Sequence, residues 1–219
     1  MKLVIFDVDG TLVDSEAIIL GAQREAFRQC GLVFPGREAG LGVVGLTLDI
    51  ALMQLAGLSQ PDERLTETYK QVFNAMRVQA ETDPAFAEPL YPGAAETLAR
   101  LAARSDITLA IATGKSRRGA DYIIERNNWR MLFASIQTAD DAPSKPHPGM
   151  IENAMRETGA AADQTWMIGD SSFDMQMAVA AGVNPVAVSW GFQPIEALQR
   201  AGARHVVADY PALERLLLI

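Results

Sequence analysis

The feature that most constrains the fold is a regular alternation of helical and strand patterns over the second half of the chain, from residue 94 onward. Each short apolar, β-rich run is separated from the next by one segment with helical spacing. The runs lie at Ile107–Ala112, Phe133–Gln137, Thr165–Ile168, Pro185–Ser189 and His205–Ala208. Because strands joined by single helices run parallel, this alternation predicts a parallel sheet with helices on both faces.

One further strand opens the chain. Residues Leu3–Phe6 form an apolar run, and Asp7, Asp9 and Gly10 follow it directly. Residues two apart on an extended chain point the same way, so the two carboxylates should converge at the end of this strand. Parallel sheets bind their ligands at that edge. Two like charges there need a cation or hydrogen-bond donors, and a hard divalent cation would offset their repulsion.

An inserted domain is predicted between the first strand and the second. Three stretches of helical spacing lie there, at about 15–30, 48–56 and 61–80. Three helices are too many for one crossover, so we expect an all-helical cap domain over residues 15–82. Residues 1–14 and 83–219 then form the α/β core, a doubly wound parallel sheet. Connectors near 13–15 and 82–92 should join the two domains.

Composition narrows the class of protein. The chain has 219 residues and a net charge of −8 without a basic run, which argues against nucleic acid or an anionic membrane surface as the main partner. Its apolar runs are too short to span a bilayer, the N-terminus lacks a signal-peptide layout, and Cys30 is the only cysteine. We therefore expect a cytoplasmic protein without disulfides, either a monomer or a homodimer.

Polar residues follow three later strands as well, and in a parallel sheet all of these strand ends share one edge. The residues expected to meet there are Asp7, Asp9, Asp170, Asp174, Thr113, Gly114 and Lys145. Carboxylates are ligands for Mg²⁺, whereas a hydroxyl, free backbone amides and a lysine can hold a phosphoryl group. This is the equipment of phosphoryl transfer. Lys115, next to Gly114, is expected to be a solvated residue at the start of a helix.

These motifs resemble those of a known family. The run from Asp7 to Ser15, Asp-Val-Asp-Gly-Thr-Leu-Val-Asp-Ser, resembles the first motif of the haloacid-dehalogenase-like (HAD) phosphatases. Thr113-Gly114, Lys145 and Gly169-Asp170 with Asp174 match the second, third and fourth motifs in order. The insert is similar to the helical C1 cap of the phosphoglycolate-phosphatase-like subgroup. The resemblance implies a Rossmann-like core and an enzyme that hydrolyses phosphate monoesters.

The resemblance also implies a role for each motif residue. Asp7 would be the nucleophile that forms an aspartyl-phosphate, and Asp9 would be the general acid and base. Mg²⁺ would be held by the carboxylates of Asp7 and Asp170 and by the backbone carbonyl of Asp9. Asp174 would support a metal-bound water or Lys145. The phosphoryl oxygens would be bound by Thr113, Gly114 and Lys145.

The expected substrate is a small phosphorylated metabolite such as phosphoglycolate, because a cap that closes over the site excludes larger ones. Gly40–Thr47 is the predicted loop that contacts the leaving group, with Gly45 and Thr47 nearest the site; a plain turn between helices is the alternative. Three other functions stay open. They are a phosphosugar mutase similar to β-phosphoglucomutase, an inorganic pyrophosphatase, and a non-catalytic protein that binds a phosphorylated ligand.

Overall fold

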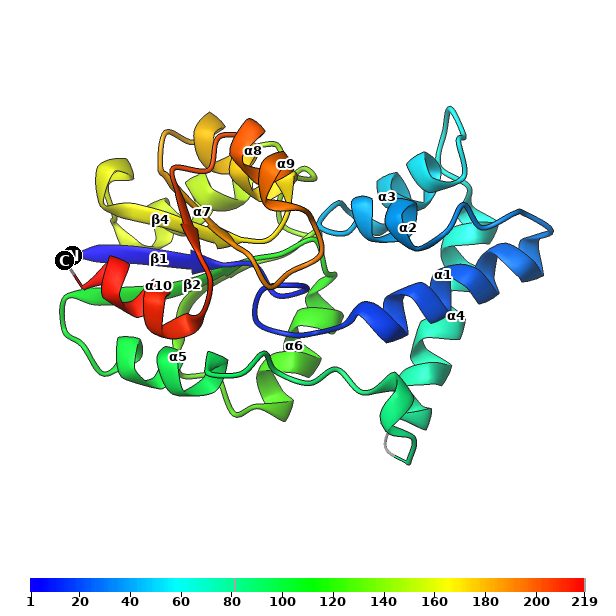
Figure 1. The fold of residues 1–219 in the computed structure, drawn as a ribbon, viewed down its shortest axis with the longest axis horizontal. Coiled ribbons are helices and arrows are strands. Elements are labelled where there is room, and N and C mark those ends of the chain that lie inside the picture. Colours follow the sequence, from blue (N-terminus) through cyan, green and yellow to red (C-terminus); the bar gives the residue numbers. More distant parts are fainter. Residues whose placement is uncertain (81, 219) are drawn as a thin grey trace.

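Six strands form one parallel sheet in the computed structural model, which describes residues 1–80 and 82–218; the sheet lies at the left in Figure 1. The strands are β1 (Lys2–Phe6), β2 (Ile107–Ala112), β3 (Phe133–Gln137), β4 (Thr165–Gly169), β5 (Asn184–Val188) and β6 (His205–Val207). Their order across the sheet is β3-β2-β1-β4-β5-β6, and every neighbouring pair is parallel. The chain order therefore reverses on the two sides of β1, which makes the C-terminal end of β1 the expected place for a ligand.

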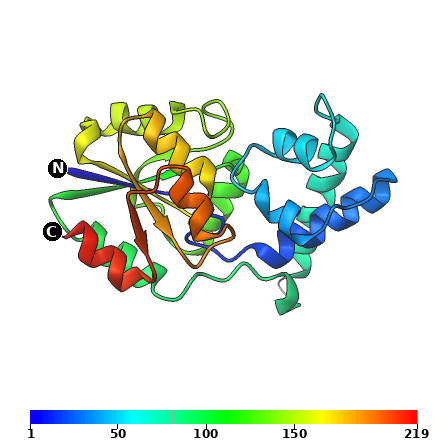
Figure 2. The same cartoon turned by 45° about the horizontal axis from the view of Figure 1, so that its top comes forward.

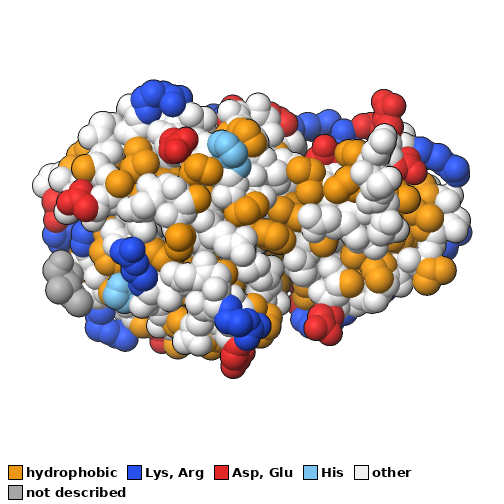
Figure 3. All heavy atoms as spheres, turned by 90° about the horizontal axis from the view of Figure 1, so that it is seen from above, with side chains coloured by type: hydrophobic (Ala, Val, Ile, Leu, Met, Phe, Trp, Pro, Cys, Tyr) orange, Lys and Arg blue, Asp and Glu red, His pale blue; other side chains and the backbone are white. Residues whose placement is uncertain are grey.

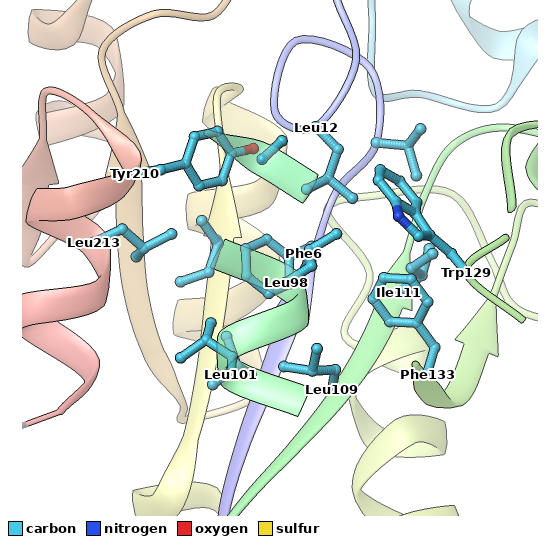
Figure 4. Packing of buried hydrophobic residues seen from close by; sticks show 14 of the residues in the cluster. Phe6, Leu12, Leu98, Leu101, Leu109, Ile111, Trp129, Phe133, Tyr210 and Leu213 are labelled. Carbon is cyan, nitrogen blue, oxygen red and sulfur yellow. The ribbon is translucent and has the colours of Figure 1, made fainter. Parts of the chain in front are cut away.

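Helices cover both faces of this sheet, which confirms the predicted α/β class. On one face lie α5 (Ala94–Ala102), α6 (Arg117–Arg126) and α10 (Tyr210–Leu217). On the other lie α7 (Gly149–Thr158) and α8 (Ser172–Ala180), with α9 (Ile195–Arg200) beside α8. Figure 4 shows the first face, where Phe6 of β1 packs among Leu98, Leu101 and Tyr210 from the helices. Burial of strand residues on both faces explains their continuous apolar runs.

A second group of helices forms the body at the right of Figures 1 and 2, far from the chain termini. It contains α1 (Glu16–Cys30), α2 (Arg37–Gly42), α3 (Leu48–Leu55) and α4 (Glu63–Gln79). These helices share a hydrophobic core of their own, which includes Phe27, Leu52 and Leu65. We call this body the cap. Its boundary with the core, at 14/15 and 82/83, stays a prediction, and positions 81 and 219 lie outside the described residues.

The short helix α2 lies between the first two predicted cap helices, in a stretch where no helix is predicted. Six residues are too few to show a helical apolar period. Gly36 precedes the helix with a φ of 106°, a conformation that suits glycine. Leu41 is buried and anchors the helix in the cap. The predicted loop Gly40–Thr47 therefore begins inside a helix, and only its second part is free of helical structure.

Two connectors join the cap to the core, and they run beside each other. Val13 of the first forms an antiparallel bridge with Leu90 of the second. The amide of Asp14 donates to the carbonyl of Pro89 at 2.8 Å, and the amide of Tyr91 donates to the carbonyl of Leu12 at 3.0 Å. The surface view shows a waist between a larger and a smaller lobe (Figure 3). The paired connectors join the two lobes, and a hinge between the lobes is expected there.

A membrane-spanning helix is not found among the residues that the structure describes. Each of their helices is too short or too polar to cross a bilayer.

Candidate active site

Three neighbouring strands bring the predicted motif residues to one edge of the sheet. Phe6 of β1 pairs with Ile111 of β2 and with Ile168 of β4, so the residues that follow these strands lie side by side. Asp7 extends β1 by donating its amide N–H to the carbonyl of Ile168 at 2.9 Å. The motif residues that follow the two neighbouring strands are Thr113 and Asp170. The edge predicted from the strand pattern is thus the place where these side chains meet.

A tight turn after β1 contacts the carboxylate of Asp170 and helps to fix its position. Residues 8–13 form this turn, and Gly10 lies in it with a φ of 72°. A Cβ atom on Gly10 would come within 2.1 Å of Oδ2 of Asp170, so only glycine lets the turn approach the carboxylate. The hydroxyl of Thr11 donates to Oδ1 of Asp170 at 3.1 Å, and the amide of Phe192 donates to Oδ2 at 2.8 Å.

Lys145 lies at the centre of the buried charges. Its Nζ atom is 3.0 Å from Oδ1 of Asp7 and 2.6 Å from Oδ1 of Asp174, and the three side chains are at most 2% exposed. Asp174 also completes the cap of α8, because the amide and the hydroxyl of Ser171 donate to its Oδ2 at 3.1 and 2.6 Å. Both oxygens of Asp174 are therefore engaged with the protein, and this residue holds Lys145 beside Asp7.

Negative charge exceeds positive charge at this edge. Burial raises the pKa of Asp7 to about 7, although Lys145 acts in the opposite direction. Burial also raises the pKa of Asp170 well above its usual value, and the nearby Asp174 and Asp7 add to the rise. For Lys145 burial alone would lower the pKa, but the two carboxylates outweigh it and hold the pKa above its ordinary value. The lysine stays charged, and the carboxylates still need further positive charge.

The acidic residues fit a divalent cation. Carboxylate oxygens of Asp7, Asp170 and Asp174 all lie within 4.8 Å of one another. Oδ1 of Asp7 is buried and accepts no well-directed hydrogen bond from the described residues, although Lys145 lies near it. A cluster of oxygen ligands with surplus negative charge suits Mg²⁺. Asp174 is already saturated by Lys145 and Ser171, so Asp7 and Asp170 are the better candidates for direct contact with an ion.

The loop after β2 offers donors to an anion. The Thr113 side chain is buried, and its Oγ1 accepts from the amide of Lys115 at 3.3 Å, which leaves its own proton free to donate. Within 1–80 and 82–218 the amide of Gly114 has no hydrogen-bond partner. Helix α6 follows directly and is capped by Ser116. A free amide and a hydroxyl just before a helix form a suitable place for phosphoryl oxygens.

The expectation that Lys115 is solvated is wrong. Its side chain is only 8% exposed, and its Nζ lies 2.9 Å from Oδ1 of Asp9. The same oxygen accepts a hydrogen bond from the hydroxyl of Ser15. Nζ also lies 3.6 Å from Oε1 of Glu88, a buried residue of the second connector. Sequence reasoning missed Lys115, Ser15 and Glu88, because only the folded chain brings the two connectors and the loop after β2 together.

A cavity of about 720 Å³ lies between these residues and the cap. Its floor includes Asp7, Asp9 and Gly114, and its roof includes Leu48 and Phe73. The roof and the floor touch closely: a Cβ atom on Gly114 would come within 2.4 Å of the carbonyl oxygen of Gly45. The amide of Thr47 donates to Oγ of Ser144 at 2.9 Å. Gly45 and Thr47 thus lie against the core at the site, and their contact with a leaving group stays a prediction.

Comparison with protein families places this geometry among known enzymes. The model of a family described as haloacid dehalogenase-like hydrolase matches residues 4–188. A protein of Dickeya dadantii named Probable phosphatase IndB is 36% identical over 209 residues, which cover 95% of this chain and 90% of that protein. A phosphoglycolate phosphatase of Pseudomonas syringae pv. syringae is 33% identical over 196 residues, which cover 87% of this chain and 70% of that protein.

Solved structures agree with the sequence relatives. A hydrolase from Pseudomonas syringae superposes with a TM-score of 0.84 at 28% identity, covering 99% of this chain and 98% of that one. A structure described as a predicted phosphatase from Clostridium acetobutylicum has a TM-score of 0.82 at 24% identity, with 99% and 98% of the two chains covered. The second supports the fold.

Proposed function

The chain belongs to the haloacid dehalogenase-like hydrolase family and is a phosphatase, and from that premise we propose that it is a Mg²⁺-dependent enzyme that hydrolyses a small phosphorylated metabolite through an aspartyl-phosphate. One observation carries the proposal: Asp7, Asp170 and Lys145 converge at the end of β1, beneath a cavity that the cap covers. The nucleophile, Thr113 and Gly114 then face the cavity, and the cation site lies directly beside the nucleophile.

In the proposed mechanism Asp7 and Asp9 divide the work. A carboxylate oxygen of Asp7 bonds to phosphorus in line as the bond from phosphorus to the leaving oxygen breaks. Asp9 gives its proton to that oxygen, so the leaving group departs as an alcohol. A water molecule then returns a proton to Asp9 and attacks the phosphorus of the aspartyl-phosphate. The acyl phosphate bond breaks, inorganic phosphate leaves, and Asp7 is regenerated.

The remaining residues bind and orient. Mg²⁺ would be held by the carboxylates of Asp7 and Asp170 with the backbone carbonyl of Asp9, and when bound it would neutralise charge on the phosphoryl oxygens and on Asp7. Asp174 holds Lys145 in place. The phosphoryl oxygens would be bound by Thr113, Gly114 and Lys145. The buried ammonium of Lys145 stays charged beside Asp7, as the transferring phosphoryl group requires.

The substrate we propose to test first is phosphoglycolate, because a relative named phosphoglycolate phosphatase is 33% identical to this chain. The docked cap limits the cavity to about 720 Å³, which suits a free metabolite rather than a macromolecule. The lone Cys30 fits a cytoplasmic enzyme that works under reducing conditions.

The experiment is a screen for phosphate release over phosphorylated metabolites in the presence of Mg²⁺, with the Asp7→Asn variant as the blank. Hydrolysis of at least one small monoester by the wild type, absent in the blank, would support the proposal. Equal phosphate release by both proteins would contradict the nucleophilic role of Asp7.

The same screen separates the rival functions. Glucose 1-phosphate converted into an isomer without release of free phosphate would identify a mutase. Release of phosphate from inorganic pyrophosphate, with no activity on monoesters, would identify a pyrophosphatase. Binding of phosphorylated metabolites without turnover would identify a binding protein.

A further inference from the structure

A row of four charged side chains runs from the cap to Asp9. The guanidinium of Arg77 donates two hydrogen bonds to the carboxylate of Glu88, each 2.9 Å long. Nζ of Lys115 lies 3.6 Å from Oε1 of Glu88 and 2.9 Å from Oδ1 of Asp9. The four side chains are between 1% and 13% exposed. Charges this deeply buried interact more strongly than exposed ion pairs, so the row is a defined structure and not a solvated surface cluster.

The members of the row come from four different parts of the chain. Arg77 lies on α4 of the cap, Glu88 lies in the second connector, and Lys115 lies in the loop between β2 and α6. The guanidinium of Arg77 also packs over Tyr122 of α6, at 4.1 Å from the ring centroid. The row therefore crosses from the cap to the core beside the hinge.

We propose that Lys115 and Glu88 are positioning residues for Asp9, and that through Arg77 they make the position of Asp9 depend on the docked cap. The inference rests on the proposed role of Asp9 as general acid and base. Lys115 and Ser15 both hold Oδ1 of Asp9, whereas Oδ2 has no hydrogen-bond partner in the described part of the chain. Oδ2 is thus available for the proton transfer, and the contacts of Oδ1 fix the orientation of the carboxylate.

Glu88 has a distinct part in this arrangement. A lysine paired with Asp9 alone keeps several rotamers of its flexible stem, and it can swing toward solvent or substrate. Glu88 gives the ammonium a second buried partner, and Arg77 holds Glu88 in turn by two parallel hydrogen bonds. If the cap moves away, Arg77 moves with α4 and Glu88 loses its strongest partner.

The test uses two phosphate esters that differ in how much they need a proton from Asp9. p-Nitrophenyl phosphate has a leaving group that departs as a stable anion, whereas benzyl phosphate must release an alkoxide unless it is protonated. We expect Lys115→Met and Glu88→Gln to lower kcat/KM for benzyl phosphate at least about tenfold more than for p-nitrophenyl phosphate. Lys115→Arg should restore part of the loss, because it keeps a cation at the same place.

The matched control is Lys70→Met, which removes a lysine that lines the same cavity but forms its ion pair with Glu67, at 2.7 Å. It should leave the ratio between the two esters unchanged. In an Asp9→Asn background, Lys115→Met should cause little further loss, since both residues would act through the same carboxylate. Thermal melting of each variant with Mg²⁺ shows whether it is folded. If Lys115→Met does not fold, the isosteric variant Glu88→Gln provides the test.

Each result decides a separate point. Equal losses for both esters in Lys115→Met and Glu88→Gln would overturn the inference while leaving the phosphatase function intact. A rise in KM confined to phosphoglycolate would also overturn it, because Lys115 would then bind the substrate's carboxylate directly. Full activity of Asp9→Asn on both esters would overturn the proposed role of Asp9, and the inference with it.

Discussion

The floor and the roof of the cavity are built in different ways. On the floor, Asp7 is almost fully buried, and the buried side chains of Lys145 and Asp170 lie next to it, each fixed by charged or hydrogen-bonded neighbours. The roof is mostly apolar, with Leu48 and Leu52 among its residues. A preorganised charged floor suits one fixed reaction. An apolar roof discriminates weakly, by about 1–3 kcal/mol for each methylene that fits or fails to fit. We therefore predict that the core sets the chemistry and that the cap sets a moderate substrate preference.

The most severe test of this division is Asp7→Asn. Loss of the nucleophile should lower kcat at least about 10⁴-fold for every substrate, whatever its leaving group. Phosphate release with p-nitrophenyl phosphate and with phosphoglycolate measures the effect. A loss that differs strongly between these two esters would mean that the floor also contributes to selectivity.

Asp170→Asn should weaken the proposed cation site beside the floor. We expect a loss of kcat/KM of roughly 10²–10³-fold, because a ligand carboxylate is replaced by a neutral amide. The wild type should gain thermal stability on addition of Mg²⁺ and lose it with a chelator, whereas the variant should show little change. Asp163→Asn, at an exposed position, is the matched control. An unaltered Mg²⁺ response in Asp170→Asn would exclude this residue as a ligand.

The free energy that it costs to bury the ionised carboxylate of Asp7 should appear as a pH-dependent stability of the metal-free protein. The folded pKa of Asp7 is about 7 against an ordinary value of 3.8, so the folded state holds a proton that the unfolded state releases between these pH values. Stability from this group is present at low pH and is lost as the pH rises through 7, by up to about 4 kcal/mol.

Chemical unfolding with a chelator between pH 4 and 8 measures this effect as the difference between wild type and Asp7→Asn. The free energy of unfolding of the wild type should fall relative to the variant as the pH rises. Saturating Mg²⁺ should remove most of the dependence, because the ion favours the ionised carboxylate. A difference that stays constant with pH would show that Asp7 is already ionised without the metal.

Substitutions in the roof should have smaller effects on the kinetics, and these effects should depend on the substrate. Leu48→Ala removes apolar area from the cavity wall without touching the floor. We expect KM to change about three- to tenfold for the preferred metabolite, with kcat nearly unchanged. Leu58→Ala, at an exposed cap position outside the wall, should have no effect. A drop in kcat equal for all substrates would contradict the separation of roof and floor.

The two regions also differ in how far the sequence predicts them. The alternation of helices and strands predicts the sheet, and the ends of β1, β2 and β4 predict which side chains share an edge, because a parallel sheet leaves few other arrangements. The sequence leaves the role of Asp174 open between a metal-bound water and Lys145, and the structure pairs Lys145 with both Asp7 and Asp174. The cap is less predictable: α2 is too short to show a period, and the sequence does not show which faces of α1, α3 and α4 form the roof.

Lys115 shows most clearly what the sequence alone cannot predict. A lysine after Gly114 and before a helix is normally solvated, and local sequence gives no reason to expect otherwise. It is buried because Asp9 and Glu88, each distant in the sequence, supply carboxylates at its ammonium. Burial of a charge depends on partners that only the tertiary structure brings together.

Removal of the hydrogen bond between roof and floor should have the smallest effect on the kinetics. Oγ of Ser144 accepts the amide of Thr47 at 2.9 Å when the cap is docked. Ser144→Ala leaves that amide unpaired and should destabilise the docked state by about 1 kcal/mol, which corresponds to roughly a fivefold rise in KM. Because Ser144 takes no part in the proposed chemistry, kcat should stay within about twofold of the wild type.

Steady-state kinetics with Ser144→Ala and with the matched control Ser105→Ala, an exposed serine without a part in the site, would separate the two cases. A rise in KM confined to Ser144→Ala means that docking of the cap contributes to substrate binding. A fall in kcat as large as the rise in KM would mean that the cap stays partly undocked even with substrate bound, so that the row from Arg77 no longer positions Asp9. That outcome would join the two regions into one catalytic unit, with Asp9 as the residue that belongs to both.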